Sequence, residues 1–209
     1  MKNESSDEFV KLAIPSNSGV SFFGRWMTIH LKADWEAQDN ASENLLKTDS
    51  LVYVDAEKFL EFSKAKEDGN EDDIREAGSN LEYHLLFEPS STTSYAGFSA
   101  TKNYLILYTL NDVKKQMTVF KIGESGGPFA LVGTDKEGKI QSISASGVDS
   151  KEGDLIWYTT SGYTQPSTLH LADLDKYGED DFITRKLKSL PQMVSISSLM
   201  HSNCILYPH

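Results

Sequence analysis

The feature that most restricts the fold of this chain is a pair of apolar strands that occurs three times in the sequence. In each copy, an apolar strand is followed by a polar turn and then by a second strand. The copies begin at Trp26, Tyr104 and Leu155, and the last two are about 51 residues apart. The first two are about 78 residues apart, and removing an insert of about 25 residues restores a single period. The copies read WMTIHLKADW with SLVYVDAEKF, YLILYTLNDV with QMTVFKIGES, and LIWYTTSGYT with STLHLADLDK.

A period of about 50 residues that holds four short strands is typical of a β-propeller blade. An immunoglobulin-like sandwich also contains many short strands, but it does not predict this repeat. The sequence therefore predicts an all-β chain, a partial β-propeller of about three four-stranded antiparallel blades, with an extra leading strand near residues 11–15. The expected strands cover residues 20–24, 26–33, 50–56, 83–89, 96–101, 104–110, 116–123, 129–134, 140–146, 155–161, 167–174 and 182–189.

The insert at residues 57–80 differs in composition from the rest of the chain. It is rich in helix formers and carries much of the acidic excess, so we expect a short helical or disordered insert on the surface.

The chain of 209 residues falls within the range of one domain, which we place at residues 1–193. Closed propellers typically have about four to eight blades, so three blades predict an open ring.

The charge of the chain argues against several partners. A formal charge of −11, from 31 acidic and 20 basic residues, argues against binding to nucleic acid or to an anionic membrane, because both are negatively charged and need a basic surface. No apolar run approaches the roughly 20 residues that cross a bilayer, and the start, MKNESSDEF, lacks the apolar core of a signal peptide. The one cysteine, Cys204, allows no intrachain disulfide. We therefore expect a cytoplasmic protein, unless an exported parent has lost its leader.

The stretch GESGGP, residues 123–128, matches the G-x-S-x-G pattern that surrounds a nucleophilic serine. That role requires a helix after the serine, but a strand-like FALVG follows here. A later histidine, His170, lies within a strand pattern, and the chain lacks the disulfide cysteines of a trypsin-like protease. We predict that the stretch links two strands, with glycines that permit a tight connection, and that Ser125 is not catalytic.

No cofactor or metal site is expected from the remaining motifs. The five histidines are not spaced with carboxylates as metal ligands, and the acidic runs at residues 71–73 and 179–181 lack the pattern of a calcium loop. Trp26, Trp35 and Trp157 could form a peptide-stacking surface, but packing between blades is the simpler interpretation. Cys204 has only His201 as an activating neighbour, so we do not interpret it as a nucleophile.

Several stretches follow one another in the order found in a known family. They are FFGRWMTIHLKADW, LLFEPSSTTSYAGFSATKNYLILYTLNDVKKQM, LIWYTTSGYTQPSTLHLADL and ITRKLKSLPQM. The chain resembles, over most of residues 10–193, the later part of the propeller domain of bacterial prolyl oligopeptidase family serine peptidases. The most specific pieces are the tryptophan-flanked strand, FEP at residues 87–89, the strand at residues 101–107 with its LNDV turn, and YTQP at residues 163–166.

In that family a seven-bladed propeller covers an α/β-hydrolase domain and admits short peptides to a Ser-Asp-His triad that cleaves after proline. The resemblance therefore implies a substrate-gating segment that is not catalytic on its own, because the triad lies in the hydrolase domain. Residues 194–209 do not resemble the family, and we expect an out-of-frame or unrelated tail on a truncated product. The alternative is a free-standing propeller module that binds a peptide or protein.

An open ring also predicts self-association. Terminal blades leave strand edges unpaired and leave apolar sheet faces without the blade that would cover them. We expect two chains to bury these surfaces against each other, or to exchange a strand.

Overall fold

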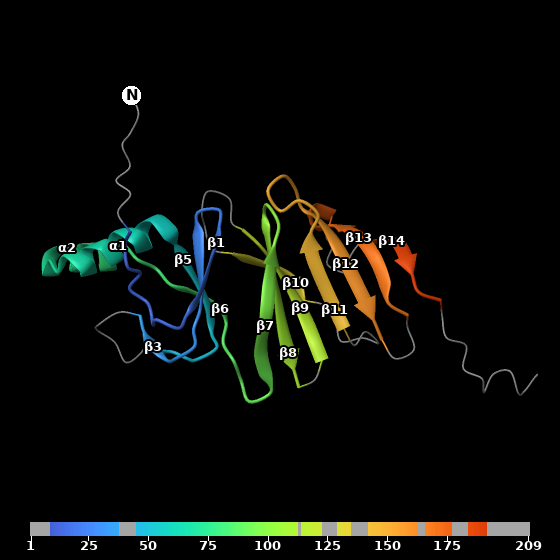
Figure 1. The fold of residues 1–209 in the computed structure, drawn as a ribbon, viewed down its shortest axis with the longest axis horizontal. Coiled ribbons are helices and arrows are strands. Elements are labelled where there is room, and N and C mark those ends of the chain that lie inside the picture. Colours follow the sequence, from blue (N-terminus) through green and yellow to red (C-terminus); the bar gives the residue numbers. More distant parts are fainter. Residues whose placement is uncertain are drawn as a thin grey trace, which may run out of the picture. The chain divides into compact units, whose positions relative to one another are not determined.

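The computed structural model describes residues 9–37, 45–112, 114–122, 129–134, 142–162, 166–176 and 184–191. These residues form three four-stranded sheets, a two-stranded ribbon and two α-helices (Figure 1). The expected all-β, partial propeller-like fold with a helical insert is therefore confirmed. The chain divides into two compact units, and the middle sheet contributes residues to both of them.

The first sheet has the order β1-β2-β5-β6, and all of its neighbouring strands are antiparallel. Its strands are β1 (Gly19–Phe23), β2 (Trp26–His30), β5 (Leu51–Asp55) and β6 (His84–Phe87). The ribbon of β3 (Trp35–Glu36) and β4 (Leu45–Leu46) lies in the connection between β2 and β5.

In the second and third sheets every strand pairs with its neighbour in sequence. The second sheet contains β7 (Thr93–Ala100), β8 (Tyr104–Asn111), β9 (Lys114–Lys121) and β10 (Ala130–Thr134). The third contains β11 (Ser142–Gly147), β12 (Leu155–Ser161), β13 (Thr168–Asp173) and β14 (Thr184–Ser189), with a 3₁₀ turn at Leu174–Lys176 after β13. Four-stranded meanders of this kind match the blade predicted from the repeat.

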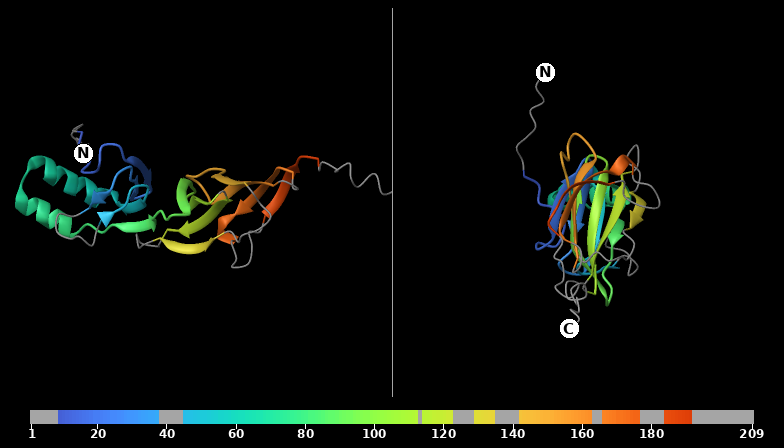
Figure 2. Two further views of the ribbon diagram at one scale, coloured as in Figure 1. Left: turned by 90° about the horizontal axis from the view of Figure 1, so that it is seen from below. Right: turned by 90° about the vertical axis from the view of Figure 1, so that its right-hand side faces the viewer.

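The insert forms two helices that lie side by side, α1 (Ala56–Asp68) and α2 (Glu71–Ser79) (Figure 2). Asp55 caps the start of α1 by accepting hydrogen bonds from the backbone N–H groups of Glu57 and Lys58. Gly69 ends it in the left-handed conformation, with φ of 74°, which glycine adopts without steric cost. Neither described helix is both long and apolar enough to span a membrane.

Helix α1 covers one face of the first sheet, which we call the capped face. Phe59 and Phe62 of the helix pack against the apolar side chains of β2 and β5, and Phe59 is fully buried. The sheet residues in this cluster are Met27, Ile29, Val52 and Val54. The insert was expected on the surface, but α1 forms part of the core, because its apolar positions fall on the side that meets the sheet.

The opposite face of the first sheet packs against residues of the middle sheet in the same unit. The His30 ring lies 4.1 Å from the Tyr95 ring, and Tyr53 stacks on Phe129 at 4.1 Å. Trp26 meets Tyr53 edge-on at 5.1 Å and is 5% exposed. Both faces of the central strands β2 and β5 are therefore covered, whereas Phe22 of β1 and Leu85 of β6 stay exposed at the edges of the capped face.

In the second unit the third sheet approaches the middle sheet closely. The Ser99 hydroxyl donates to the Ala145 carbonyl at 3.0 Å. A Cβ atom at Gly147 would lie 3.2 Å from the carbonyl oxygen of Ala100, so a larger residue there would force the strands apart. Sheet faces thus pack on sheet faces within each unit, as blades require.

One sequence expectation about the strands is wrong. Residues 11–15 form no strand, and this segment instead runs along α1, where the Ala13 N–H donates to the Ser63 hydroxyl at 3.2 Å. Leu12, Ala13 and Ile14 pack against the core below the helix. The apolar residues that suggested a strand are therefore explained by contact with α1.

The capping role of α1 predicts unequal effects of two neighbouring substitutions. Phe59→Ala should lower the free energy of unfolding in urea by about 3–5 kcal/mol, because it leaves a cavity in a closed core. Leu60→Ala, at a position that is 39% exposed, should change it by about 0.5 kcal/mol or less. Similar losses for both variants would mean that α1 does not pack on the sheet.

Candidate functional site

Ser125 and the rest of the GESGGP stretch lie outside the described residues. The segment connects β9 with β10, which are neighbours in the middle sheet, so it joins the two strands expected from the sequence. The residue after it, Phe129, stacks on Tyr53 and donates its backbone N–H to the Tyr53 hydroxyl at 2.7 Å. That Ser125 is not a nucleophile stays a prediction.

The described histidines pack against aromatic rings. His84 stacks on Tyr53 at 4.7 Å, and His170 lies 5.9 Å from Tyr158. Burial, reinforced by a nearby lysine in each case, lowers the pKa of His30 and of His170. Within the described ranges, no three His, Cys, Asp or Glu side chains gather in a way that could hold a metal ion. Positions 201, 204 and 209 lie outside those ranges.

The three tryptophans have different environments. Trp26 is buried against Tyr53 and Phe129, and Trp35 meets the Tyr83 ring edge-on at 5.4 Å. Trp26 thus packs between sheets as expected, whereas Trp35 packs in the cluster that α1 covers. Trp157 is 39% exposed on the third sheet, where it reaches solvent instead of a neighbouring sheet.

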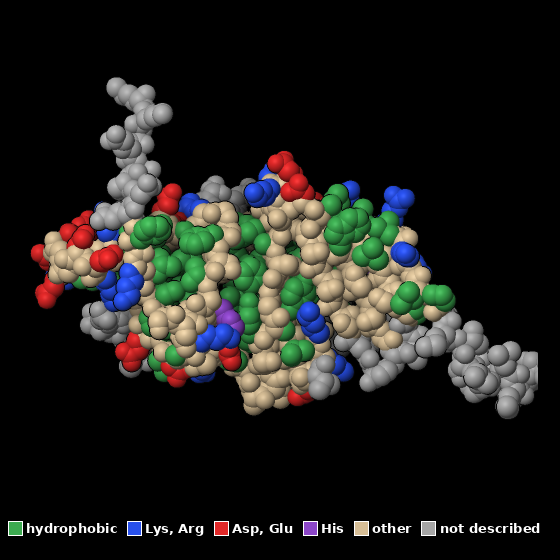
Figure 3. Space-filling model, viewed as in Figure 1, with side chains coloured by type: hydrophobic (Ala, Val, Ile, Leu, Met, Phe, Trp, Pro, Cys, Tyr) green, Lys and Arg blue, Asp and Glu red, His purple; other side chains and the backbone are tan. Residues whose placement is uncertain are grey.

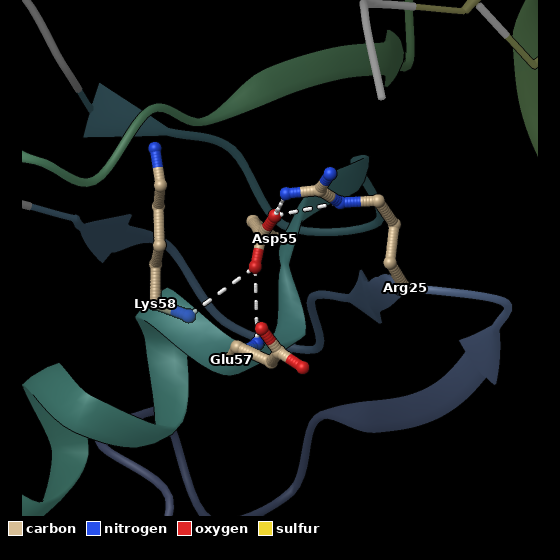
Figure 4. Close-up of polar contacts among 4 residues, drawn as sticks. All are labelled: Arg25, Asp55, Glu57 and Lys58. Carbon is tan, nitrogen blue, oxygen red and sulfur yellow. Dashed lines mark hydrogen bonds and ion pairs between the residues drawn. The ribbon is translucent and has the colours of Figure 1, made fainter. Parts of the chain in front are cut away.

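A first polar site joins the first sheet to α1. Asp55 is the last residue of β5, and one of its oxygens, Oδ1, caps the helix at 3.1 Å from the Glu57 nitrogen and 3.3 Å from the Lys58 nitrogen. Its other oxygen, Oδ2, accepts from the guanidinium of Arg25, with Nε at 2.9 Å and Nη2 in closer contact (Figure 4). Arg25 lies in the turn between β1 and β2, so this site, the Asp55 clamp, connects three elements.

The electrostatics of the clamp favour an ionised Asp55. Burial opposes the charge, but hydrogen bonds from Arg25 and from the Lys58 and Glu57 backbone outweigh it and lower the pKa of Asp55 below its usual 3.8. The Asp55 side chain is 9% exposed while that of Arg25 is 51% exposed, so the carboxylate is held inside and the cation faces solvent. Removal of Arg25 would leave a buried carboxylate without its ion-pair partner, held only by the backbone N–H groups of Glu57 and Lys58.

A second polar site joins the middle sheet to the third sheet within the second unit. Asp154, which precedes β12 and is 6% exposed, accepts from the Thr101 hydroxyl at 2.7 Å. The backbone N–H and the side-chain amide of Asn103 also donate to it, at 2.8 and 2.6 Å. We call this the Asp154 staple. It fixes the turn between β7 and β8 against the start of β12 with charge-assisted hydrogen bonds.

The staple continues to the 3₁₀ turn after β13. The Leu174 N–H donates to the Asp154 carbonyl at 3.1 Å, and the Tyr104 hydroxyl donates to Asp175 at 3.0 Å. Burial and this hydrogen bond to Asp175 raise the pKa of Tyr104 to about 12. Tyr104 therefore stays a neutral donor at physiological pH.

A third feature is an apolar surface on the third sheet. Its buried face carries Ile143, Ala145, Ile156, Tyr158 and Ala172, which are at most 7% exposed. The other face, which we call the open face, carries Leu155, Trp157, Leu169 and Leu171 along β12 and β13, together with Thr159 and the acidic Asp173. Three serines of β11 and two basic residues of β14 flank these, namely Ser142, Ser144, Ser146, Arg185 and Lys188.

The open face is exposed in spite of its composition. Leu155 is 42% and Trp157 39% exposed, and hydrophobic side chains reach the surface in the region of β12 to β14 (Figure 3). Exposed apolar patches of this kind commonly mark interaction sites. The open face is therefore the candidate interaction surface.

A cleft of about 340 Å³ between α1 and α2 is a weaker candidate. Carboxylates dominate its lining, with Glu61, Asp68, Asp73 and Glu76, and Lys64 is its one basic lining residue. A solvated acidic surface explains such a lining, so we assign no ligand to it.

The Asp55 clamp predicts that the stability difference between the wild type and Asp55→Asn depends on pH. Asp55→Asn should lose the ion pair but keep a good helix cap, whereas Asp55→Ala should lose both and be less stable by about a further 1 kcal/mol. Because the pKa of Asp55 is lowered on folding, its contribution is present above pH 4 and disappears as pH falls through that lowered pKa. The gap between the wild type and Asp55→Asn in urea unfolding should therefore shrink as pH is lowered from about 6 to about 3. A gap that is independent of pH would exclude the ionised clamp.

The Asp154 staple predicts that one amide substitution is costly and a nearby one is not. Asp154→Asn should reduce the free energy of unfolding by about 1–3 kcal/mol, because its NH₂ group must replace either Oδ1, which accepts from the Thr101 hydroxyl and the Asn103 N–H, or Oδ2, which accepts from the Asn103 side-chain amide. Asp149→Asn is the matched control, since Asp149 is exposed and an asparagine oxygen can still accept from the Lys151 N–H. Equal effects of the two substitutions in urea unfolding would argue against the staple.

Comparison with known proteins adds sequence and fold evidence. No family model matches the chain. It is 25% identical over 165 residues to an uncharacterized peptidase from Sinorhizobium fredii, and the match covers 78% of the chain and 20% of that protein. It also shares the fold of part of a post-proline cleaving enzyme from Rickettsia typhi, with a TM-score of 0.61 and 18% identity. That match covers 87% of the chain and 23% of the enzyme.

The chain thus spans about a fifth of the length of the peptidase and under a quarter of the enzyme. The sequence match to a peptidase and the fold match to a post-proline cleaving enzyme confirm that this chain resembles one segment of prolyl oligopeptidase family peptidases.

Proposed function

We propose that this chain is a substrate-gating propeller segment of a prolyl oligopeptidase-like serine peptidase, and that it is not catalytic on its own. The observation that carries the proposal is the fold. Three four-stranded meanders align over 87% of the chain with part of a post-proline cleaving enzyme. In the family that the chain resembles, the triad belongs to the hydrolase domain, so catalysis would require sequence outside the matched segment.

The packing of the sheets suits a gating role. A wall that excludes folded proteins but admits short peptides must keep its shape, and tightly packed sheets deform little. The Asp55 clamp and the Asp154 staple add charged hydrogen bonds at the ends of strands, where a sheet otherwise frays. The substrates of the complete enzyme would be short proline-containing peptides.

A cytoplasmic location is part of the proposal. The single cysteine, Cys204, permits no intrachain disulfide, so the fold does not depend on an oxidising compartment.

A second candidate is a free-standing module that binds a peptide or protein. The open face favours it, since Leu155 and Trp157 present apolar surface to solvent without a covering sheet. This candidate predicts saturable binding of a protein or peptide by the isolated chain, with loss of binding when Trp157 is replaced.

The proposal predicts no peptidase activity from the purified chain. A fluorogenic peptide that reports cleavage after proline should be hydrolysed at the rate of buffer alone, both by the wild type and by Ser125→Ala. A matched sample of an active prolyl oligopeptidase confirms that the assay works. Hydrolysis by the wild type that disappears in Ser125→Ala would overturn the proposal and restore GESGGP as a nucleophile site.

A further inference from the structure

The first sheet and the start of β7 meet through a small set of rings. Tyr95 of β7 lies over the His30 ring, with the ring centroids 4.1 Å apart and the planes tilted by 45°, and its own centroid is 6.5 Å from that of Phe87. Residues 93–97 belong to the same compact unit as the first sheet. Because His30 ends β2 and Phe87 ends β6, Tyr95 holds the first half of β7 against the ends of two strands.

His30 is the side chain of this contact that can change its charge near neutral pH. The side chain is 15% exposed, and its Nε2 atom is buried and makes no hydrogen bond. The Tyr95 hydroxyl stays neutral in this range, since burial raises the pKa of Tyr95 above its usual 10. Protonation of His30 would therefore place a charge between the first sheet and the strand that packs on it.

Two exposed charged groups lie beside the His30 ring. Asp49, in the turn before β5, places its Oδ1 atom 3.3 Å from His30 Nε2. Lys32, which follows β2, places its Nζ atom 3.3 Å from the same oxygen. Asp49 already has a cationic partner, so a protonated His30 would share one carboxylate oxygen with Lys32.

The backbone fixes the position of the turn that carries Asp49. The Asp49 N–H donates to the Leu31 carbonyl at 2.8 Å, and the Leu31 N–H donates to the Ser50 carbonyl at 3.0 Å. Asp49 has a φ of 63°, a left-handed conformation in which aspartate and asparagine are both enriched. An asparagine at position 49 should therefore keep the turn while it removes the charge.

We propose that His30 makes the contact between the first sheet and β7 sensitive to acid: the neutral imidazole packs on Tyr95, and its protonation weakens the hold on the first half of β7. The inference goes beyond the gating role and does not depend on it, because it rests on contacts within one compact unit.

The balance of effects on His30 favours the neutral ring. Burial and the charge of Lys32 lower the pKa of His30 below 6.5, and together they outweigh Asp49, which acts in the opposite direction. The folded chain thus binds this proton less tightly than the unfolded chain does. The stability that the neutral ring confers is present above pH 6.5 and is lost as pH falls from 6.5 to the lowered pKa.

Native-state hydrogen exchange of the full chain, corrected for the intrinsic effect of pH, tests the proposal at the amides of residues 93–97 that bond to β8. Between about pH 7.5 and 5.5, the opening constant of these amides should rise at least about threefold in the wild type. His30→Phe keeps a ring over Tyr95 but cannot be protonated, so it should abolish the rise. His30→Gln repeats the test with a smaller side chain, in case phenylalanine disturbs the packing.

Two charge substitutions distinguish this electrostatic role from a purely structural one. Lys32→Met removes the cation that opposes protonation, so the midpoint of the His30 ring titration, followed by NMR, should move to higher pH. Asp49→Asn removes the anion that favours protonation, so the midpoint should move to lower pH. The side chains of Lys32 and Asp49 are 47% and 51% exposed, so both variants should fold.

Three results would overturn the proposal. The first is a wild type whose β7 amides open equally at both pH values, or open less in acid because Tyr95 and Asp49 hold the imidazolium. The second is a rise that survives in both His30 variants. That result would point to His84, which stacks on Tyr53 on the same face and lies 3.9 Å from Glu82. The third is a titration midpoint that moves in the same direction in Lys32→Met and Asp49→Asn.

Discussion

The structure depends on one constraint, namely that a four-stranded meander has two faces and cannot bury either of them by itself. Each sheet must therefore be covered by something else, and the repeat in the sequence supplies further sheets of the same size. In each unit, sheet faces meet through large side chains, as where Tyr53 stacks on Phe129. Where the first sheet has no further sheet beside it, α1 supplies the cover, and Phe59 fills the space below the helix. On the open face of the third sheet, Leu155 and Trp157 remain 42% and 39% exposed.

The polar sites follow from the same constraint. Sheets that meet face to face still need their strand ends fixed, and both the Asp55 clamp and the Asp154 staple lie at strand ends. Each uses one buried carboxylate to hold elements that are distant in sequence, with Arg25 and Asp55 separated by 30 residues and Thr101 and Asp154 by 53. Both carboxylates thus hold the architecture together, which is compatible with the gating segment proposed above.

Much of the fold could be predicted from the sequence, because alternating apolar residues and turn signals are local. The twelve expected strands all have counterparts, and β7 begins at Thr93, earlier than expected, because the polar stretch before Gly97 resembles a loop. The cover provided by α1 could not be predicted, since it depends on which side of the helix meets a distant sheet. Asp55 carries a recognisable helix-cap signal, but its pairing with Arg25 and the contacts of Asp154 arise only in the folded chain.

Native-state hydrogen exchange, resolved by residue, tests the central claim most directly. If coverage of sheet faces governs stability, the amides of β2 and β5 should exchange slowest, because both faces of these strands are covered. The amides of β12 and β13 should exchange faster, through openings of lower free energy, because one face of their sheet is open. Equal protection in the first and third sheets, or rapid exchange in β2 and β5, would contradict the account.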